Sequence, residues 1–430
     1  MNTASTAWNA PVASSPINGT VRMPGSKSQT NRAFVLAALG NSESVIEFPL
    51  LARDTELMLS AITALGSKIS AEQDRIFIEP GLTDKEEVAI DVGLAGTVMR
   101  FVPPLAALTH SKVHFDGDSA ARVRPMSVML AALSQLGVEV ENQSNGFLPF
   151  SINGRGSVSG SEVTIDASSS SQFVSGLLLA GARFNNGLTI HHQGKALPSF
   201  PHIQMTMQML NQLGISCQHQ SSNSKNHSWI IKPQLVPGNH WRIEPDLSNA
   251  GPFLAAAMVT AGKVTISDWP ETTTQAGGQL PTILKKMGAE ISFDENGLTL
   301  QGPNTISALS IDLGEVGELT PTVAALLALA DGESEISGIA HLRGHETDRI
   351  SALAHDLSQV GVDIKTTNEG LIISPRQLHG GAWKSFADHR MATAGAIIGL
   401  KVSGVVIDDI TCTSKTMKNF EELWVNLISS

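Results

Sequence analysis

Hydrophobic and polar positions follow a long period along this chain. Six times, a short polar cluster precedes a run rich in Ala, Leu and Val that has the apolar spacing of a buried helix. The spacings between successive openings are 68, 75, 78, 71 and 69 residues, and the openings are Ser28, Gly96, Ser171, Asn249, Thr320 and His389. This regularity indicates an internal repeat of roughly 70 residues.

A second series, made of glycines, has the same period. Hydrophobic helix patterns end and β-type runs begin at Gly66, Gly137, Gly214, Gly288 and Gly361. Glycine suits these positions because it can adopt the left-handed conformation that ends a helix. Turn dipeptides then separate apolar runs, as a hairpin requires, at Asn145–Gly146, Asn296–Gly297 and Glu369–Gly370. One repeat therefore reads helix, strand, helix, strand, strand.

The sixth repeat lacks a closing hairpin, because the chain ends soon after the segment that begins at Phe420. We predict that the N-terminus completes it, through residues 10–23 with the strand-like stretch 19–23. The chain would then form a discontinuous domain of residues 1–26 plus 246–430 and a continuous domain of residues 27–245. Two crossings, near Pro24 and Pro245, would join the domains as a hinge. The runs 32–39 and 390–400 are apolar around most of their circumference, so we expect such helices to be central.

Length and composition fit two globular domains. The chain has 430 residues, of which 42% are hydrophobic, enough for two cores. The longest candidate for a membrane span, residues 101–109, contains Pro103 and Pro104. Residues 1–24 lack a secretory signal pattern. Cys217 and Cys412 form no CxxC motif and have no histidine at ligand spacing, which favours a reducing compartment without a structural metal. A bacterial-type cytoplasmic enzyme is expected.

Positive charge is concentrated where the apolar helices begin, although the net charge is −11. That net charge disfavours nucleic acid or an anionic membrane as a partner. The clustered cations are Lys27, Arg32, Arg100, Arg124, Arg349, Arg390 and Lys415. Helix starts bind phosphate or carboxylate through backbone N–H groups and the helix dipole, and basic side chains strengthen that binding. If several repeats direct these helix starts to one cleft, that cleft is an anion-binding site.

Each cluster alone has an ordinary explanation. Residues 168–171 could be a serine linker or a helix cap, and Gly96 with Thr97 could form a tight turn. The sequence 388–390 could be a helix cap with a surface ion pair, and 345–349 could be a solvated helix face without zinc-ligand spacing. The shared phase of the clusters favours a common function.

Taken together, these motifs are specific to one family. They are Pro24-Gly25-Ser26-Lys27-Ser28, Asn31-Arg32, Ala95-Gly96-Thr97, Met99-Arg100, Arg124-Pro125, Ser170-Ser171-Gln172-Phe173, His345-Glu346-Thr347-Asp348-Arg349, Asp388-His389-Arg390-Met391 and Lys415-Thr416. Over nearly its whole length the chain resembles the 5-enolpyruvylshikimate-3-phosphate synthases of the enolpyruvyl transferase superfamily. The resemblance implies a two-domain inside-out α/β fold of six βαβαββ repeats, three per domain, with the active site in the interdomain cleft.

The resemblance also implies a reaction. The enolpyruvyl group of phosphoenolpyruvate would pass to the 5-hydroxyl of shikimate 3-phosphate, releasing phosphate, in the shikimate pathway to aromatic amino acids. The continuous domain would lie on the shikimate 3-phosphate side and the discontinuous domain on the phosphoenolpyruvate side. The resemblance implies no metal or organic cofactor; it suggests a monomer, with glyphosate as an inhibitor.

Site residues carry over motif by motif. Those expected to bind shikimate 3-phosphate are Lys27, Ser28, Arg32, Ser170, Ser171, Gln172, Ser199, Glu318, His341 and His345. Among them the four serines would bind its phosphate and Arg32 its carboxylate. Those expected to bind phosphoenolpyruvate are Lys27, Gly96, Arg124, Gln172, Arg349, Arg390 and Lys415. The expected catalytic residues are Lys27, Glu318, Glu346 and His389. In this hypothesis Glu318 takes the hydroxyl proton, and Glu346, assisted by Lys27 and with His389 nearby, exchanges protons with the methylene carbon.

Several positions depart from the enterobacterial pattern of this family. Glu318 replaces Asp, which keeps a carboxylate and lengthens its reach. His341 and His345 replace Asn and Lys, which would make part of the site's charge depend on pH. The other departures are His202 for Tyr, Leu94 for Asn and Phe101 for Pro.

Two alternatives remain at this stage. UDP-N-acetylglucosamine 1-carboxyvinyltransferases share the fold and the phosphoenolpyruvate chemistry, but they typically carry a Cys before the Arg-Pro motif, and residues 117–123 contain none. A non-catalytic scaffold that sequesters a phosphorylated metabolite would need the cations but neither Glu318 nor Glu346.

Overall fold

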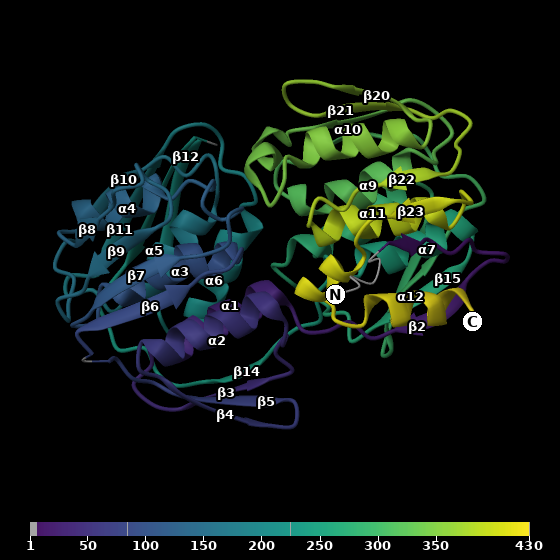
Figure 1. Cartoon of the computed structure of the whole chain (residues 1–430). Coiled ribbons are helices and arrows are strands. Elements are labelled where there is room, and N and C mark those ends of the chain that lie inside the picture. Colours follow the sequence, from purple (N-terminus) through teal and green to yellow (C-terminus); the bar gives the residue numbers. More distant parts are fainter. Residues whose placement is uncertain (1–6, 84, 224, 430) are drawn as a thin grey trace, which may run out of the picture. The chain divides into compact units, whose positions relative to one another are not determined.

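The computed structural model describes residues 7–83, 85–223 and 225–429. The chain divides into two compact units (Figure 1): the discontinuous unit, Met1–Pro24 with Glu244–Ser430, and the continuous unit, Gly25–Ile243. Residues 1–6 of the predicted discontinuous domain lie outside the described residues. Within the described part of the chain, no helix has the length and apolar character needed to cross a membrane.

The continuous unit contains three four-stranded sheets. In spatial order, the first sheet consists of β14 (His240–Arg242), β3 (Ser44–Glu47), β5 (Arg75–Glu79) and β4 (Lys68–Glu72). The second consists of β6 (Glu87–Asp91), β7 (Lys112–Asp116), β9 (Phe150–Asn153) and β8 (Glu139–Glu141). The third consists of β10 (Glu162–Ile165), β11 (Leu188–Gln193), β13 (Asn226–Ile231) and β12 (Cys217–Asn223). The helices of this unit are α1 (Lys27–Ala38), α2 (Arg53–Ala64), α3 (Gly96–Ala106), α4 (Ser127–Gln135), α5 (Gln172–Gly181) and α6 (Pro201–Gln212).

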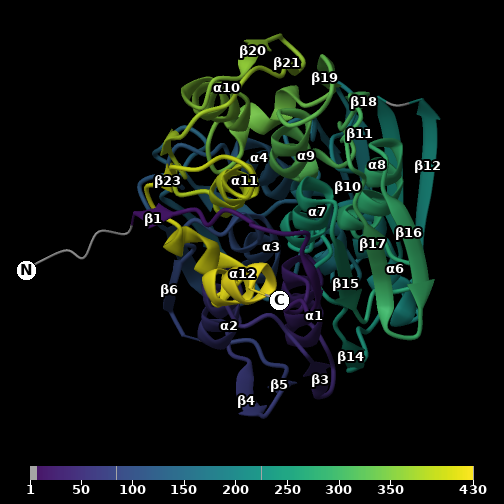
Figure 2. The same ribbon diagram turned by 90° about the vertical axis from the view of Figure 1, so that its right-hand side faces the viewer.

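The discontinuous unit contains two four-stranded sheets and one three-stranded sheet among the described residues. Their strands are β16 (Glu290–Asp294), β17 (Gly297–Gln301), β15 (Lys263–Ser267) and β2 (Asn18–Val21); β18 (Ser310–Asp312), β19 (Ser334–Ser337), β21 (Leu371–Ser374) and β20 (Asp363–Thr366); and β1 (Trp8–Asn9), β23 (Val405–Ile407) and β22 (Gly381–Trp383). Its helices are α7 (Gly251–Thr260), α8 (Leu280–Lys286), α9 (Thr320–Leu327), α10 (Arg349–Gln359), α11 (His389–Gly399) and α12 (Phe420–Ile428). Figure 2 shows the β16–β17 hairpin beside β15, and β2 pairs with the other edge of β15.

Every sheet combines one parallel and at least one antiparallel pairing. In the sheet of β10 to β13, for example, β10 runs parallel to β11, while β13 runs antiparallel to both β11 and β12. The parallel pair needs a crossover helix, and the antiparallel pair needs only a hairpin. The result is a mixed α/β architecture, as the sequence predicts.

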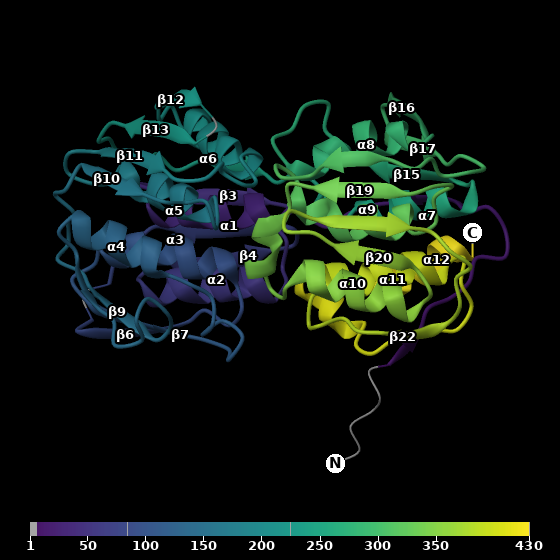
Figure 3. The same ribbon diagram turned by 90° about the horizontal axis from the view of Figure 1, so that it is seen from above.

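The helices that open the repeats form the two cores. All six begin within two residues of the predicted openings. In the continuous unit α1, α3 and α5 contact one another, and in the discontinuous unit α7, α9 and α11 do so (Figure 3). In α1, residues 33–37 are at most 1% exposed, and in α11 Ala392, Ala394 and Ala396 to Ile398 are fully buried. The central placement expected for the all-round apolar helices is therefore confirmed.

The predicted helix-ending glycines are confirmed as well. Gly66, Gly137, Gly214, Gly288 and Gly361 follow α2, α4, α6, α8 and α10, with φ values of 120°, 84°, 72°, 105° and 96°. A side chain would be strained in this left-handed region. The φ values therefore explain why each of these five helices is followed by a glycine.

The prediction for the N-terminal strand was wrong in one respect. The sixth sheet is completed by β1, which pairs antiparallel with β23, and not by residues 19–23. Residues 18–21 instead form β2, which pairs parallel with β15. Elsewhere the strand before an opening helix joins the sheet of its own repeat. The strands before α1 and α7 are exchanged: β2 joins the sheet of β15, and β14 joins that of β3. This exchange requires the chain to pass twice between the units.

Candidate active site

In the continuous unit, Lys27 and Ser28 are the first residues of α1. Ser26 caps this helix, because its hydroxyl accepts a bond from the Gln29 N–H at 3.4 Å. Lys27 Nζ lies 3.2 Å from Asp54 Oδ2, and the Asp54 side chain is only 4% exposed. Asp54, in the first turn of α2, therefore fixes the Lys27 ammonium at the start of α1.

Gly96, the first residue of α3, lies where three polar side chains converge. A Cβ at this position would come within 3.1 Å of Arg124 Nη2 and Gln172 Oε1, and within 3.2 Å of Arg100 Nη1. Arg124 Nη1 also donates to the Leu94 carbonyl at 3.2 Å. Nearby, Asn31 Nδ2 donates to Thr97 Oγ1 at 2.8 Å and ties α1 to α3. The structure thus brings Gly96, Arg124 and Gln172 together, and the missing side chain of Gly96 keeps space open between them.

Arg100 adds a buried cation to this cluster. Its side chain is 3% exposed, lies 5.6 Å from the Phe173 ring centroid, and has no hydrogen-bond partner for Nε. Within the described residues it forms no ion pair. Burial, with repulsion from Arg124, lowers the pKa of Arg100 well below its usual value. Two neighbouring guanidinium groups at low dielectric favour the binding of an anion.

Arg32, expected to bind a carboxylate, is 1% exposed and links α1 to α6. Nε donates to Thr206 Oγ1 at 2.8 Å, Nη1 to the Ser28 carbonyl at 2.8 Å and Nη2 to the His202 carbonyl at 2.9 Å. The guanidinium lies over Phe101, 5.1 Å from the ring centroid. A bound carboxylate would have to share or replace these bonds.

Of the four predicted phosphate-binding serines, Ser28 lies in the first turn of α1, and the other three lie on two loops of the same unit. Ser170 and Ser171 directly precede α5, and Ser171 is 3% exposed. Ser199 lies two residues before α6 and has a φ of 51°, which is uncommon for a residue with a side chain. Strain of this kind is often found at ligand-binding positions.

In the discontinuous unit, Arg349 and Asp388 form a buried bidentate ion pair. Arg349 Nε lies 2.7 Å from Asp388 Oδ2, and Nη2 lies 3.1 Å from Oδ1; their side chains are 3% and 0% exposed. Asp388 also caps α11, accepting from the Arg390 N–H at 2.9 Å. Burial tends to raise the pKa of Asp388, but the charge of Arg349 outweighs it and the pKa is lowered overall. The sequence suggested a cap with a surface ion pair; the cap is present, but the ion pair is buried.

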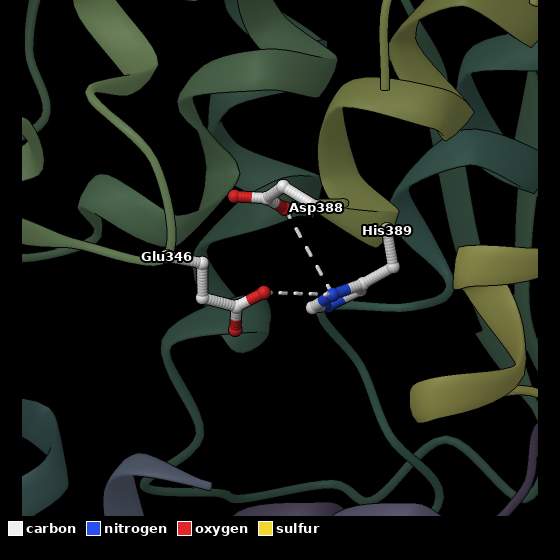
Figure 4. A group of neighbouring side chains, drawn as sticks. All are labelled: Glu346, Asp388 and His389. Carbon is white, nitrogen blue, oxygen red and sulfur yellow. Dashed lines mark ion pairs between the residues drawn. The ribbon is translucent and has the colours of Figure 1, made fainter. Parts of the chain in front are cut away.

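Glu346 lies between Lys415 and His389, two other residues of the predicted site, and Figure 4 shows its contact with His389. Its Oε1 is 3.0 Å from Lys415 Nζ, and its Oε2 is 3.6 Å from His389 Nδ1. His389 is 3% exposed, and burial lowers its pKa despite the neighbouring carboxylates of Glu346 and Asp388. A neutral imidazole, a carboxylate and an ammonium are therefore within reach of one another, which is a chemically competent set for moving a proton.

Glu318 and the two departing histidines lie in the same unit. Glu318 accepts a hydrogen bond from the Ser248 hydroxyl and lies 3.7 Å from Arg390 Nη2. His345 Nδ1 lies 3.4 Å from Arg349 Nη1, and the His341 and His345 ring centroids are 5.6 Å apart. Burial lowers the pKa of His341 to about 4. The expected pH-dependent charge therefore does not come from His341 near neutral pH.

The Glu346, Asp388 and His389 side chains also meet a geometric condition for a metal site, because three ligand atoms lie within 4.8 Å of one another. Both carboxylates already face a cation, Lys415 for Glu346 and Arg349 for Asp388. Lys415 and Arg349 would repel a divalent cation. The cluster fits an ion-pair network better than a metal centre.

The predicted site residues thus fall into two clusters, one in each unit. The continuous unit holds Lys27, Ser28, Arg32, Gly96, Arg124, Ser170, Ser171, Gln172 and Ser199; the discontinuous unit holds Glu318, His341, His345, Glu346, Arg349, His389, Arg390 and Lys415. Sequence reasoning missed the roles of Asp54 and Asp388. Asp388 carried a signal, since an Asp directly before a predicted helix is a frequent cap, whereas nothing local marks Asp54 as the partner of Lys27.

Solved structures show the fold of the chain. An EPSP synthase from Acinetobacter baumannii superimposes with a TM-score of 0.80 at 22% identity, covering 98% of each chain. The enolpyruvyl transferase NikO from Streptomyces tendae gives 0.74 at 15% identity, covering 97% of this chain and 96% of that one. The architecture is therefore that of the enolpyruvyl transferases.

Sequence comparison identifies the family within this architecture. The model of the EPSP synthase (3-phosphoshikimate 1-carboxyvinyltransferase) family matches residues 12–424. A protein of Kocuria rhizophila named 3-phosphoshikimate 1-carboxyvinyltransferase is 49% identical, with 98% of this chain and 97% of that protein covered. A protein of the same name from Mycobacterium ulcerans is 47% identical over the same shares. The chain belongs to the EPSP synthase family.

Proposed function

We infer that this chain is a 3-phosphoshikimate 1-carboxyvinyltransferase. It transfers the enolpyruvyl group of phosphoenolpyruvate to the 5-hydroxyl of shikimate 3-phosphate and releases phosphate, a step of the shikimate pathway. Membership of the family over residues 12–424 carries this conclusion. The two clusters support it, since both substrates are anions and both clusters are rich in buried cations.

In the proposed mechanism, shikimate 3-phosphate is bound by Lys27, Ser28, Arg32, Ser170, Ser171, Gln172 and Ser199, together with Glu318, His341 and His345. Phosphoenolpyruvate is bound by Lys27, Gly96, Arg124, Gln172, Arg349, Arg390 and Lys415. The guanidinium and ammonium groups neutralise the carboxylate and the leaving phosphate, which gains charge as the C–O bond breaks.

Proton transfer is proposed for the discontinuous unit. Glu318 accepts the proton of the attacking hydroxyl, and Ser248, which donates to it, orients the carboxylate. Glu346 exchanges a proton with the methylene carbon, and its contacts with Lys415 and His389 hold it in place. Lys27 assists from the start of α1. Such positioned groups each contribute about 10²–10⁴-fold to a rate.

Phosphate release from phosphoenolpyruvate tests this function. Release with shikimate 3-phosphate and none with UDP-N-acetylglucosamine is the expected result, and the reverse would assign the chain to the other transferase. Release with neither acceptor would favour a binding scaffold. Burial raises the pKa of both Cys217 and Cys412 to about 12, which fits structural thiols and not a reactive one.

Further proposals concern the state of the protein. We propose a monomer in the cytoplasm that uses no cofactor, binds neither nucleic acid nor membrane, and is inhibited by glyphosate. Sedimentation at working concentrations and inhibition competitive with phosphoenolpyruvate test two of these points.

Replacing Gly96 with alanine is expected to raise KM for phosphoenolpyruvate about tenfold, equivalent to about 1.4 kcal/mol. The new Cβ would lie 3.1 Å from Arg124 Nη2 and Gln172 Oε1, so both groups must shift from the position in which they meet the anion. KM for shikimate 3-phosphate should change less, and glyphosate inhibition should weaken in parallel. Steady-state kinetics with each substrate varied measures the three effects.

Gly332→Ala is the matched control, because its Cβ would meet only Ala308 Cβ, at 3.3 Å. It should leave both KM values at the wild-type level. Equal increases of both KM values in Gly96→Ala would contradict an assignment of Gly96 to the phosphoenolpyruvate side.

A further inference from the structure

Three of the four predicted phosphate-binding serines lie on two loops that start at the same edge of one sheet. The 166–171 loop follows β10 and carries Ser170 and Ser171; the 194–200 loop follows β11 and carries Ser199. Strands β10 and β11 are parallel neighbours, so their carboxyl ends lie side by side. Neither loop has regular secondary structure that would fix it to the other.

His192, the fifth residue of β11, joins the two loops. Its side chain is 1% exposed. The Ala167 N–H, in the first loop, donates to His192 Nδ1 at 3.1 Å. His192 Nε2 lies 2.9 Å from the Lys195 carbonyl oxygen, in the second loop. One imidazole ring therefore spans the gap between the two backbones.

The two partners leave His192 a single protonation pattern. A backbone N–H can only donate, so Nδ1 must carry the lone pair, and a carbonyl oxygen can only accept, so Nε2 must carry the proton. The ring is therefore a neutral Nε2–H tautomer with both nitrogens used. The bond to the Ala167 N–H is buried and the bond to the Lys195 carbonyl is partly buried, so removing the ring would leave both backbone groups without this partner.

A second contact brings the same loops together. Asp166 Oδ1 accepts from the Ser168 N–H at 2.9 Å and from the Ser168 hydroxyl, whose oxygen also lies 3.2 Å from the Lys195 carbonyl. Gly194 packs against this pair so closely that a Cβ would lie 2.2 Å from Asp166 Oδ1. Both contacts meet at the Lys195 carbonyl oxygen, so the His192 ring and the Asp166–Ser168 pair together fix the spacing of the two loops.

We propose that His192 is a positioning residue for the phosphate group of shikimate 3-phosphate. It touches no substrate; it sets the distance between Ser170 and Ser171 on one loop and Ser199 on the other, so that their hydroxyls bind the same phosphate. This inference rests on the proposed function, because the phosphate is that of the acceptor substrate.

Three substitutions separate the two bonds. His192→Phe keeps the ring and removes both bonds, and KM for shikimate 3-phosphate should rise about tenfold or more. His192→Asn can keep an acceptor near Nδ1, and His192→Gln can keep a donor near Nε2, so each should recover part of that loss. Because the loops act on acceptor binding, kcat and KM for phosphoenolpyruvate should change much less than KM for shikimate 3-phosphate.

His191→Phe is the matched control, because His191 is the neighbouring residue of β11 but bonds Ser228 Oγ and Glu162 Oε1, away from both loops. Isothermal titration with shikimate 3-phosphate alone, together with the melting temperature, accompanies the kinetics for all variants. The proposal is supported if only the His192 variants lose acceptor affinity, with Asn or Gln partly restoring it.

A His192→Phe protein that melts at a lower temperature yet binds shikimate 3-phosphate as tightly as wild type would overturn the proposal, because His192 would then be only structural. If His192→Phe does not fold, the Asn and Gln variants decide in the same way. Failure of the proposed function looks different: the wild type would bind shikimate 3-phosphate without releasing phosphate, or would not bind it at all.

Discussion

Replacing Glu346 with glutamine is expected to lower kcat by about 10²–10⁴-fold, the range that a positioned acid or base contributes. Glutamine has the same shape and can still accept a bond from Lys415, 3.0 Å from Oε1, but it cannot take up a proton. The KM values should therefore change little while turnover falls. Phosphate release under saturating substrates measures kcat, and exchange of the phosphoenolpyruvate methylene protons in deuterated water reports the step itself.

Glu369→Gln is the control for this substitution, since Glu369 is an exposed glutamate in the turn between β20 and β21 of the same unit. It should retain wild-type turnover. A Glu346→Gln enzyme with near wild-type kcat would show that another group moves the proton, and His389, with Nδ1 3.6 Å from Glu346 Oε2, would be the next candidate.

Local features of the sequence predict the elements of this fold well. The openings of the six central helices are marked by polar residues before a long apolar run, and the helix ends by glycines with positive φ. Both signals depend only on the few residues around each helix end. This is why the predicted periodicity locates the helices within two residues.

Local sequence does not predict which distant strands pair. β1 is only two residues long and carries no alternating pattern, yet it pairs with β23. The strand at 18–21 was recognised, but its partner was not, because an amphipathic strand fits any sheet edge that offers a matching apolar face. The choice of β15 as its neighbour is settled by packing of the whole unit and leaves no mark in the local sequence.

The site shows the same division. Lys27, Gly96, Glu346 and the other predicted residues stand in motifs that a family resemblance carries over. The residues that support them stand in no such motif. The bond between His192 and Ala167 and the ion pair between Lys27 and Asp54 join residues that are 25 and 27 positions apart. Which side chain meets which is decided by the fold, so these supporting residues become visible only in the structure.

Replacing Asp388 with asparagine is expected to destabilise the protein by about 3–5 kcal/mol, the usual loss when one partner of a buried ion pair is removed. Arg349 would stay buried without its bidentate partner, and only the more remote charges of Glu346 and Glu318 would act on it. Asparagine can still cap α11, so the loss comes mainly from the ion pair. Equilibrium urea denaturation followed by tryptophan fluorescence measures the shift. Asp363→Asn, which removes the exposed partner of Arg376, should change stability by no more than about 1 kcal/mol.

A double substitution and the pH dependence test whether the ion pair causes this loss of stability. Arg349→Met combined with Asp388→Asn should be less destabilising than the sum of the single changes, because no unpaired charge stays buried. The pKa of Asp388 is lowered in the folded protein, so its ionised form adds stability above the unfolded value of about 3.9, and this contribution is lost as the pH falls through the folded pKa. The difference between wild type and Asp388→Asn should therefore be constant near neutral pH and should shrink only below about pH 4. A difference that stays unchanged at lower pH, with single effects that simply add, would contradict a stabilising ion pair between Asp388 and Arg349.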